Sequence, residues 1–224
     1  MSDALITRQL ATGLTAMHLE LPAAAQSKLL AYLDLLAKWN HAYNLTAVRD
    51  PAVMVSRHLL DSLAALPFVA GPALADIGSG AGLPGIPLAI ARPELAVTLI
   101  ESNGKKARFL REAARSLPLP NVTIAQARVQ DASDTFDTIT ARAFASLADM
   151  LVWGGHLLAP GGRWLALKGQ LDHDEITDIP KLFQVTSVHA LDVPGTEGAR
   201  CLIQLARANL RDPDPATHPR AMVG

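Results

Sequence analysis

The first third of the chain carries apolar residues at helical spacing. Between residues 22 and 43 they recur three and four positions apart, at Leu29, Leu33 and Leu36. Asp50-Pro51 has the form of an N-cap followed by proline at the first helical position, which predicts another helix to about Leu66. We therefore expect a helical N-terminal region over residues 1–66, packed on the rest of the chain.

From residue 73 the pattern changes to short apolar segments that alternate with helical ones. Strands are expected near 73–77, 96–101, 122–127, 137–141 and 163–168. This alternation predicts an α/β fold with a doubly wound, mostly parallel sheet covered on both faces. Two last strands, at 185–193 and 200–206, should form a C-terminal antiparallel hairpin. The main domain then covers residues 67–208, and residues 209–224 are expected to form a flexible tail.

The segment Asp76–Gly85 begins at the end of the first predicted strand and holds four glycines and a proline. Glycine permits a sharp turn with positive φ, and the missing Cβ lets the backbone approach a ligand closely. The segment therefore predicts a strand, a tight turn and a helix start that together bind a nucleotide-like cofactor.

Composition narrows the class of protein. Half of the 224 residues are hydrophobic and 18% are charged, which suits one domain with a sizeable core. The single cysteine, Cys201, leaves no intramolecular disulfide. Neither a signal peptide nor a membrane span is recognisable, so we expect a cytoplasmic protein that does not contact membranes. The formal net charge of −1 argues against a general nucleic-acid coat.

Two classes of cofactor use such a glycine loop. Gly80 to Gly85 fits the Gly-x-Gly-x-x-Gly pattern of dinucleotide-binding enzymes, so an NAD-dependent oxidoreductase is one alternative. However, Asp76 precedes the glycines, and a carboxylate suits the cationic S-adenosylmethionine (AdoMet) better than a pyrophosphate. The chain also has no Tyr-x-x-x-Lys pair. AdoMet is therefore the favoured cofactor, with Gly78, Gly80 and Gly82 expected to contact it.

Two further residues should reach the same edge of the sheet. Glu101 ends the second predicted strand, where a carboxylate can hold the cofactor ribose or cap the following helix. Arg142 ends the fourth. Because ligands bind at the carboxyl ends of parallel strands, both are candidate site residues.

These segments together closely resemble the RsmG family, also called glucose-inhibited division protein B. The resemblance covers about residues 30–206, and its most particular blocks are Asn44-Leu45-Thr46, His58-x-x-Asp61-Ser62-Leu63 and Arg142-Ala143-Phe144-Ala145-Ser146-Leu147. It implies a class I methyltransferase fold and methylation of guanine N7 in small-subunit (16S) ribosomal RNA. A methyltransferase of another RNA or of a small molecule is the alternative within the class, and a non-enzymatic binding module is the alternative outside it.

The resemblance also implies cofactor contacts at Gly78, Leu83, Val129, Gln130 and Arg142. The chain departs from the family at two points. Arg128-Val129-Gln130-Asp131 stands where similar sequences commonly have Arg-Val-Glu-Glu, and Arg200-Cys201 stands where they have Arg-His. The cofactor contact of the family's glutamate side chain is therefore not carried over to Gln130, and the role of the family's histidine is not carried over to Cys201.

Guanine N7 attacks through a lone pair that carries no proton, so the reaction needs no general base. Catalysis would come mainly from holding N7 at near-attack distance, which can contribute roughly 7 to 11 kcal/mol. We expect the cations Arg142 and Lys168 near guanine O6. Cys201 lies in a predicted strand and is interpreted as a buried, inert thiol.

RNA-binding candidates lie in several segments. Five of the 20 Lys and Arg residues fall between 105 and 115, and Lys106 and Arg111 are the proposed phosphate contacts. Asn44, His58 and Arg200 complete the predicted substrate-binding set, although His58 and Asp61 could simply be a hydrogen-bonded pair that fixes the helical region. Small-subunit rRNA or the 30S particle is the expected partner of a monomer.

No metal is expected. The seven histidines are scattered, and Asp172-His173-Asp174-Glu175 has the pattern of an exposed helix start.

Overall fold

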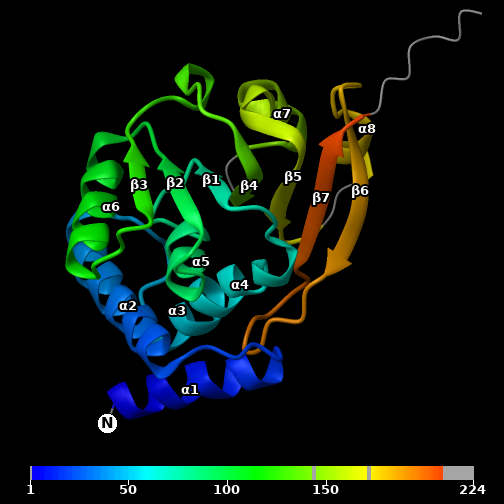
Figure 1. Cartoon of the computed structure of the whole chain (residues 1–224). Coiled ribbons are helices and arrows are strands. Elements are labelled where there is room, and N and C mark those ends of the chain that lie inside the picture. Colours follow the sequence, from blue (N-terminus) through cyan, green and yellow to red (C-terminus); the bar gives the residue numbers. More distant parts are fainter. Residues whose placement is uncertain (1, 143–144, 171–172, 209–224) are drawn as a thin grey trace, which may run out of the picture.

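The computed structural model describes residues 2–142, 145–170 and 173–208. Within them one sheet of seven strands has the order β3-β2-β1-β4-β5-β7-β6 (Figure 1). The strands are β1 (Ala73–Ile77), β2 (Ala96–Ile100), β3 (Val122–Ala125), β4 (Phe136–Arg142), β5 (Leu158–Lys168), β6 (Phe183–Ala190) and β7 (Cys201–Arg207). The predicted tail at 209–224 lies outside the described residues.

The pairing confirms the predicted α/β class. Strands β1 to β5 pair in parallel, and β7 runs antiparallel between β5 and β6. The strand order reverses at β1, which has β2 on one side and β4 on the other. This reversal is the switch point at which open α/β sheets bind ligands. The sequence placed the start of β5 five residues too late, because the Pro160-Gly161-Gly162 segment hid the beginning of the strand.

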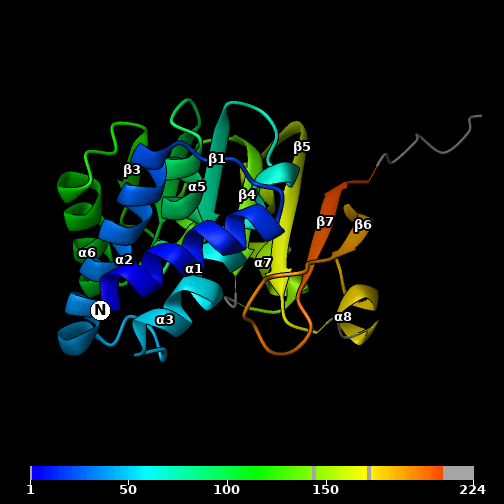
Figure 2. The same cartoon turned by 90° about the horizontal axis from the view of Figure 1, so that it is seen from below.

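Helices cover both faces of the sheet. One core packs the sheet against α1 (Ser2–Ala16), α2 (Ala23–Tyr43), α5 (Gly85–Ala91) and α6 (Gly104–Ser116). A second core packs the other face against α7 (Leu147–Gly154). Adjacent residues of β1 divide between the two, with Leu74 in the first core and Ala75 in the second. The helix α1 crosses one end of the molecule, in front in the view of Figure 2.

The helix expected from Pro51 is interrupted. It begins as α3 (Pro51–Met54), with the Asp50 side chain accepting from the Ala52 N–H at 2.9 Å, as the sequence predicted. It then widens into the π-helical turn η1 (Val55–Leu60), continues as α4 (Asp61–Leu63) and is followed by the 3₁₀ turn η2 (Leu66–Phe68). Single π turns are frequent at functional sites, and this one carries Arg57 and His58.

Three short elements complete the fold: η3 (Val129–Asp131), η4 (Gly155–Leu157) and α8 (His173–Thr177).

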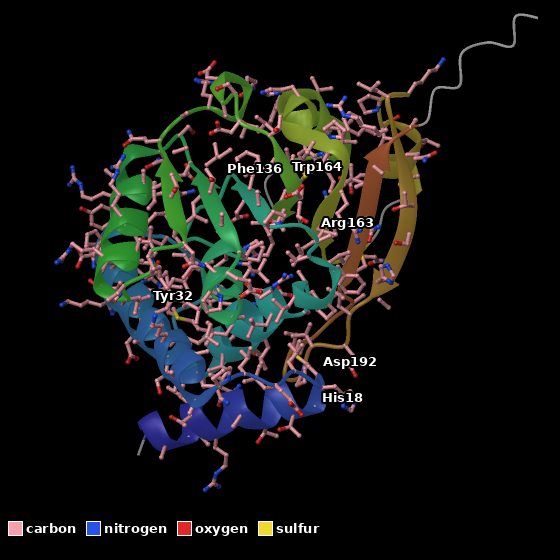
Figure 3. The ribbon with its side chains drawn as sticks, viewed as in Figure 1. His18, Tyr32, Phe136, Arg163, Trp164 and Asp192 are labelled. Atoms are coloured by element: carbon pink, nitrogen blue, oxygen red, sulfur yellow. The ribbon has the colours of Figure 1, made fainter. Side chains whose placement is uncertain are left out.

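The helical region is joined to the glycine segment through Tyr32. This residue of α2, labelled in Figure 3, is fully buried. Its hydroxyl donates to the Ala81 carbonyl at 2.7 Å. Burial raises the pKa of the Tyr32 hydroxyl, which therefore stays protonated as a donor. The division of the chain at residue 66 remains a prediction, since the helices and the sheet share one core.

Candidate functional site

The glycine segment forms the turn that its sequence predicts. Gly78, Gly80 and Gly82 have φ values of 61°, 60° and 86°, which L side chains rarely adopt. A Cβ built on Gly80 would meet only the Gly78 carbonyl oxygen, at 3.8 Å, so this part of the loop borders open space. A Cβ on Gly85 would lie 2.3 Å from Leu99 Cδ2. The last glycine therefore serves the packing of α5 on β2.

Asp76 lies beneath this turn rather than at its surface. It is fully buried; Oδ2 accepts the Gly85 N–H at 3.1 Å and Oδ1 accepts the Thr140 hydroxyl at 3.2 Å. Burial raises the pKa of this carboxyl to about 7. The contacts seen for Asp76 shape the loop and bind the first turn of α5. Its predicted contact with the cofactor stays a proposal.

A cavity of about 250 Å³ lies beside the turn, and we call it the glycine-loop cavity. Its walls come from Ile100 at the end of β2, from residues that follow β1, β2 and β3, and from Trp153 of α7. Four predicted cofactor residues are among those lining it: Gly78, Glu101, Val129 and Gln130. The remaining predicted contacts are not among the described residues that line it: Asp76, Gly80, Gly82, Leu83 and Arg142.

Glu101 links this cavity to two backbone elements. Its Oε2 accepts the Gly80 N–H at 2.9 Å, and its Oε1 accepts the Asn103 N–H at 2.8 Å. Asn103 is the N-cap of α6, and its side chain accepts from the N–H groups of Lys105 and Lys106. The carboxylate thus orders the glycine loop and the start of α6 at once. Each oxygen retains acceptor capacity for a ligand hydroxyl.

A larger cavity of about 500 Å³ lies at the carboxyl ends of β4 and β5, and we call it the arginine cavity. Four cations line it: Arg57, Arg142, Lys168 and Arg200. Asp61 and His58 from the interrupted helix line it as well. Three predicted substrate or catalytic cations, on segments far apart in sequence, therefore meet here together with His58. Arg142 lines this cavity and not the smaller one.

Asp61 joins two of these cations. Its Oδ2 accepts from Arg142 Nη1 at 2.9 Å, and its Oδ1 lies 3.3 Å from Arg200 Nε. The Asp61 side chain is 9% exposed and each arginine side chain 19%. The sequence suggested a His58–Asp61 pair, which is wrong because the carboxylate turns to the arginines of the main domain.

Lys168 is held by two acceptors. Its Nζ donates to the Ala145 carbonyl at 3.1 Å and to Glu175 Oε1 at 2.9 Å. The sequence interpretation missed Glu175, which it assigned to an exposed helix start, although the side chain is only 26% exposed. Cys201 lies opposite Lys168 in the β5–β7 register and is buried as expected; burial raises the pKa of its thiol.

His58 is braced by a segment that the sequence interpretation gave no separate role. Thr46 Oγ1 lies 2.9 Å from His58 Nε2 and also accepts the Val48 N–H at 3.1 Å. Burial, with a further contribution from Arg142, lowers the pKa of His58 to about 4, so the ring is neutral at pH 7. The Asn40 side chain binds the same segment through the Thr46 N–H and the Val48 carbonyl.

Asn44 lies apart from this network. It is exposed, caps α2 with a left-handed φ of 49°, and is not among the described residues that line the arginine cavity. Its predicted contact with substrate stays a proposal.

The predicted phosphate contacts lie on α6. Lys106 is half-buried, and Arg111 is exposed and donates to Gln126 Oε1 at 2.8 Å. Neither residue is among those that line the two cavities.

Comparisons with known proteins decide the family. The model of the family described as GidB, rRNA small subunit methyltransferase G, matches residues 25–203. The chain belongs to this family. A Xanthomonas campestris pv. campestris member with the name ribosomal RNA small subunit methyltransferase G is 54% identical over 200 residues, which cover 88% of this chain and 93% of the relative. A Xanthomonas oryzae pv. oryzae member is 53% identical over 205 residues, covering 91% and 96%.

Solved structures add the fold. TrmN from Thermus thermophilus has a TM-score of 0.53 at 18% identity, covering 75% of this chain and 53% of that one. The mitomycin 7-O-methyltransferase MmcR has a TM-score of 0.59 at 17% identity, covering 79% and 60%. These likenesses agree with the class I methyltransferase sheet that the family implies.

The described residues contain no group of three or more His, Cys, Asp or Glu side chains arranged to hold a metal ion. Nor does any helix among them have the length and apolar character needed to span a membrane.

Proposed function

We propose that the chain transfers the methyl group of AdoMet to N7 of a guanine in small-subunit rRNA. The observation that carries this proposal is that the two cavities lie at the ends of two neighbouring strands, β1 and β4. Ile77, the last residue of β1, pairs with Ala141 of β4, so Gly78, which follows β1, and Arg142, which ends β4, are neighbours at this edge of the sheet. Gly78 lines the glycine-loop cavity and Arg142 the arginine cavity. A cofactor in the first would therefore face a substrate in the second.

The glycine-loop cavity suits the adenosine part of AdoMet. The buried Glu101 carboxylate can accept ribose hydroxyls, and the apolar Val129 and Ile100 side chains can contact the adenine ring. Open space beside Gly80 leaves room for the backbone to approach the ligand. AdoMet, when bound, supplies an electrophilic methyl group on a sulfonium that leaves as a neutral thioether.

The arginine cavity suits a guanine that needs orientation and no base. N7 donates its own lone pair to the methyl group, and the base becomes cationic. Arg142 and Lys168 would fix O6, the acceptor next to N7. Both side chains are already held, by Asp61 and by Glu175 respectively, so little rotamer freedom is lost at the moment of reaction.

The remaining titratable groups of this cavity fit the same chemistry. His58 is neutral at pH 7 and adds no charge beside a base that becomes positive. The raised pKa of Cys201 keeps it a thiol, which makes it a poor nucleophile for the carbon-5 methylation of pyrimidines. A displacement at a ring nitrogen requires neither group to react.

Family membership supports small-subunit rRNA as the substrate, since relatives more than 50% identical carry that name. We further propose that Lys106 and Arg111 of α6 contact RNA phosphates, that Asn44 and Arg200 contact the substrate, and that the enzyme is a cytoplasmic monomer.

The test is methyl transfer from labelled AdoMet to rRNA that lacks the modification. Naked small-subunit rRNA, 30S particles and an unrelated RNA are incubated separately with the protein. Label in the first or second and not in the third supports the proposal and identifies the preferred form of the substrate. Label in none of them contradicts it. Calorimetric titration with AdoMet and NADH provides the cofactor control, because an NAD-dependent oxidoreductase would bind only the latter.

A further inference from the structure

Arg142 and Arg200 share the Asp61 carboxylate but are held unequally. Arg142 Nη1 donates to Asp61 Oδ2 at 2.9 Å and to the Arg57 carbonyl at 3.1 Å. Arg200 Nε lies 3.3 Å from Asp61 Oδ1. Within the described part of the chain, the one hydrogen bond that the Arg200 side chain makes is to the carbonyl of its neighbour Ala199, at 2.8 Å. Arg200 is therefore the more weakly held cation.

The backbone at Arg142 is also more firmly held than the backbone at Arg200. Arg142 ends β4 in the middle of the sheet, paired with Leu167 of β5. Arg200 ends the loop between β6 and β7, which turns at Gly195 and Gly198 with φ values of 76° and 81°. A side chain at the end of this loop can change partner without disturbing the sheet.

A phosphate group can replace a carboxylate on arginine. Both anions accept hydrogen bonds from the planar guanidinium fork, and phosphate offers more acceptor oxygens. Among the described residues, four cations and the Asp61 carboxylate line the arginine cavity, and Glu175 pairs with one of the cations, Lys168. Positive charge is therefore in excess, and its field attracts an anion. RNA carries such an anion at every nucleotide.

We propose that Asp61 holds Arg142 throughout, and holds Arg200 only until RNA enters, when a substrate phosphate takes its place on Arg200. The inference rests on the proposed function. Asp61 is then a positioning residue, which acts on the base through Arg142 and competes with RNA for Arg200.

This double role predicts two effects of opposite sign for Asp61→Asn. Turnover falls by at least about tenfold, because Arg142 loses the charged partner that orients it. RNA binding tightens by about twofold to fivefold, because the partly buried contact between Asp61 and Arg200, at 3.3 Å, is a weak ion pair whose loss frees Arg200. A purely structural role for Asp61 would weaken binding instead, since the cavity would lose its order.

The experiment measures binding of an unmethylated small-subunit rRNA transcript across a range of salt concentrations. Arg200→Ala should weaken binding and lower the salt slope by about one. In the double variant Asp61→Asn/Arg200→Ala the tightening should disappear. The matched control is Glu197→Gln, which removes an exposed negative charge from the loop that carries Arg200. Tightening no greater than in this control, or tightening that survives in the double variant, overturns the inference.

A second measurement uses the unaltered protein, in case Asp61→Asn does not fold. Inorganic phosphate is titrated while the Nε–H signals of the two arginines are followed by NMR, assigned with Arg→Lys variants. The inference predicts a shift for Arg200 and none for Arg142; shifts of both signals, or of neither, overturn it. This result does not depend on catalysis. Absence of methyl transfer by the wild-type protein would instead contradict the proposed function.

Discussion

Glu101 orders two backbone segments with one carboxylate, accepting from the Gly80 and Asn103 N–H groups. Its neutral amide analogue keeps one acceptor oxygen and loses the charge. Hydrogen bonds to charged groups contribute about 1.5–3 kcal/mol, so Glu101→Gln should weaken AdoMet binding by about tenfold or more. Calorimetric titration measures this, with the exposed Glu94→Gln as control. Equal affinity in the two variants would remove Glu101 from the cofactor site.

Two buried groups give the folding stability opposite dependences on pH. The pKa of His58 falls to about 4 in the folded state. The contribution of the neutral ring to the free energy of unfolding is therefore complete above pH 6.5 and is lost as the pH falls toward 4. The pKa of Asp76 rises to about 7, so its contribution is complete below pH 3.8 and is lost as the pH rises through 7. Between pH 4 and 6.5, rising pH therefore increases the free energy of unfolding through His58 and decreases it through Asp76.

A variant that lacks one of these groups should therefore show the pH dependence of stability that the other group causes. Relative to wild type, Asp76→Asn should gain stability more steeply as the pH rises from 4 to 6.5, whereas His58→Gln should gain less or lose it. Urea unfolding at several pH values measures the free energy of unfolding of each variant. Parallel profiles for all three proteins would show that neither pKa is shifted as described.

At the scale of elements, α2 supports the glycine segment through a single buried hydroxyl. Tyr32→Phe leaves the Ala81 carbonyl without that donor, which costs about 1–3 kcal/mol for a buried polar group. Because Ala81 lies between Gly80 and Gly82, AdoMet affinity should fall as well. Tyr43→Phe on the same helix is the control, because the Tyr43 hydroxyl makes only a long hydrogen bond, at 3.4 Å, with the exposed Arg108. Unfolding by urea and AdoMet titration should separate the two variants; equal behaviour would contradict the role of Tyr32.

The elements also show where sequence reasoning succeeded. Strand β1 and the N-cap at Asp50 have local signals, namely an apolar run before glycines and an Asp-Pro pair, and the structure confirms both. The π turn at Val55–Leu60 has no such signal, because its residues also suit an α-helix. The partners of Asp61, at positions 142 and 200, depend on tertiary packing and had to be observed.

At the scale of the whole molecule, the net charge of −1 conceals a local concentration of cations on α6. Reversing two of them, Lys106→Glu and Arg111→Glu, should weaken rRNA binding and reduce its salt slope by about two, one for each phosphate contact. Reversal of two exposed cations elsewhere, Arg8→Glu and Lys181→Glu, is the control for total charge. Equal salt slopes in the two double variants would argue against α6 as the RNA surface.

The central claim concerns the acceptor atom, and chemical cleavage tests it most directly. Methylation at N7 makes a guanine sensitive to reduction followed by aniline, which breaks the RNA at that nucleotide. After incubation with AdoMet and the wild-type protein, unmethylated small-subunit rRNA or 30S particles should be cleaved at one new position. Arg142→Ala should reduce the cleaved fraction by orders of magnitude at equal reaction time. Methyl incorporation without aniline cleavage would place the methyl group on another atom and contradict the account.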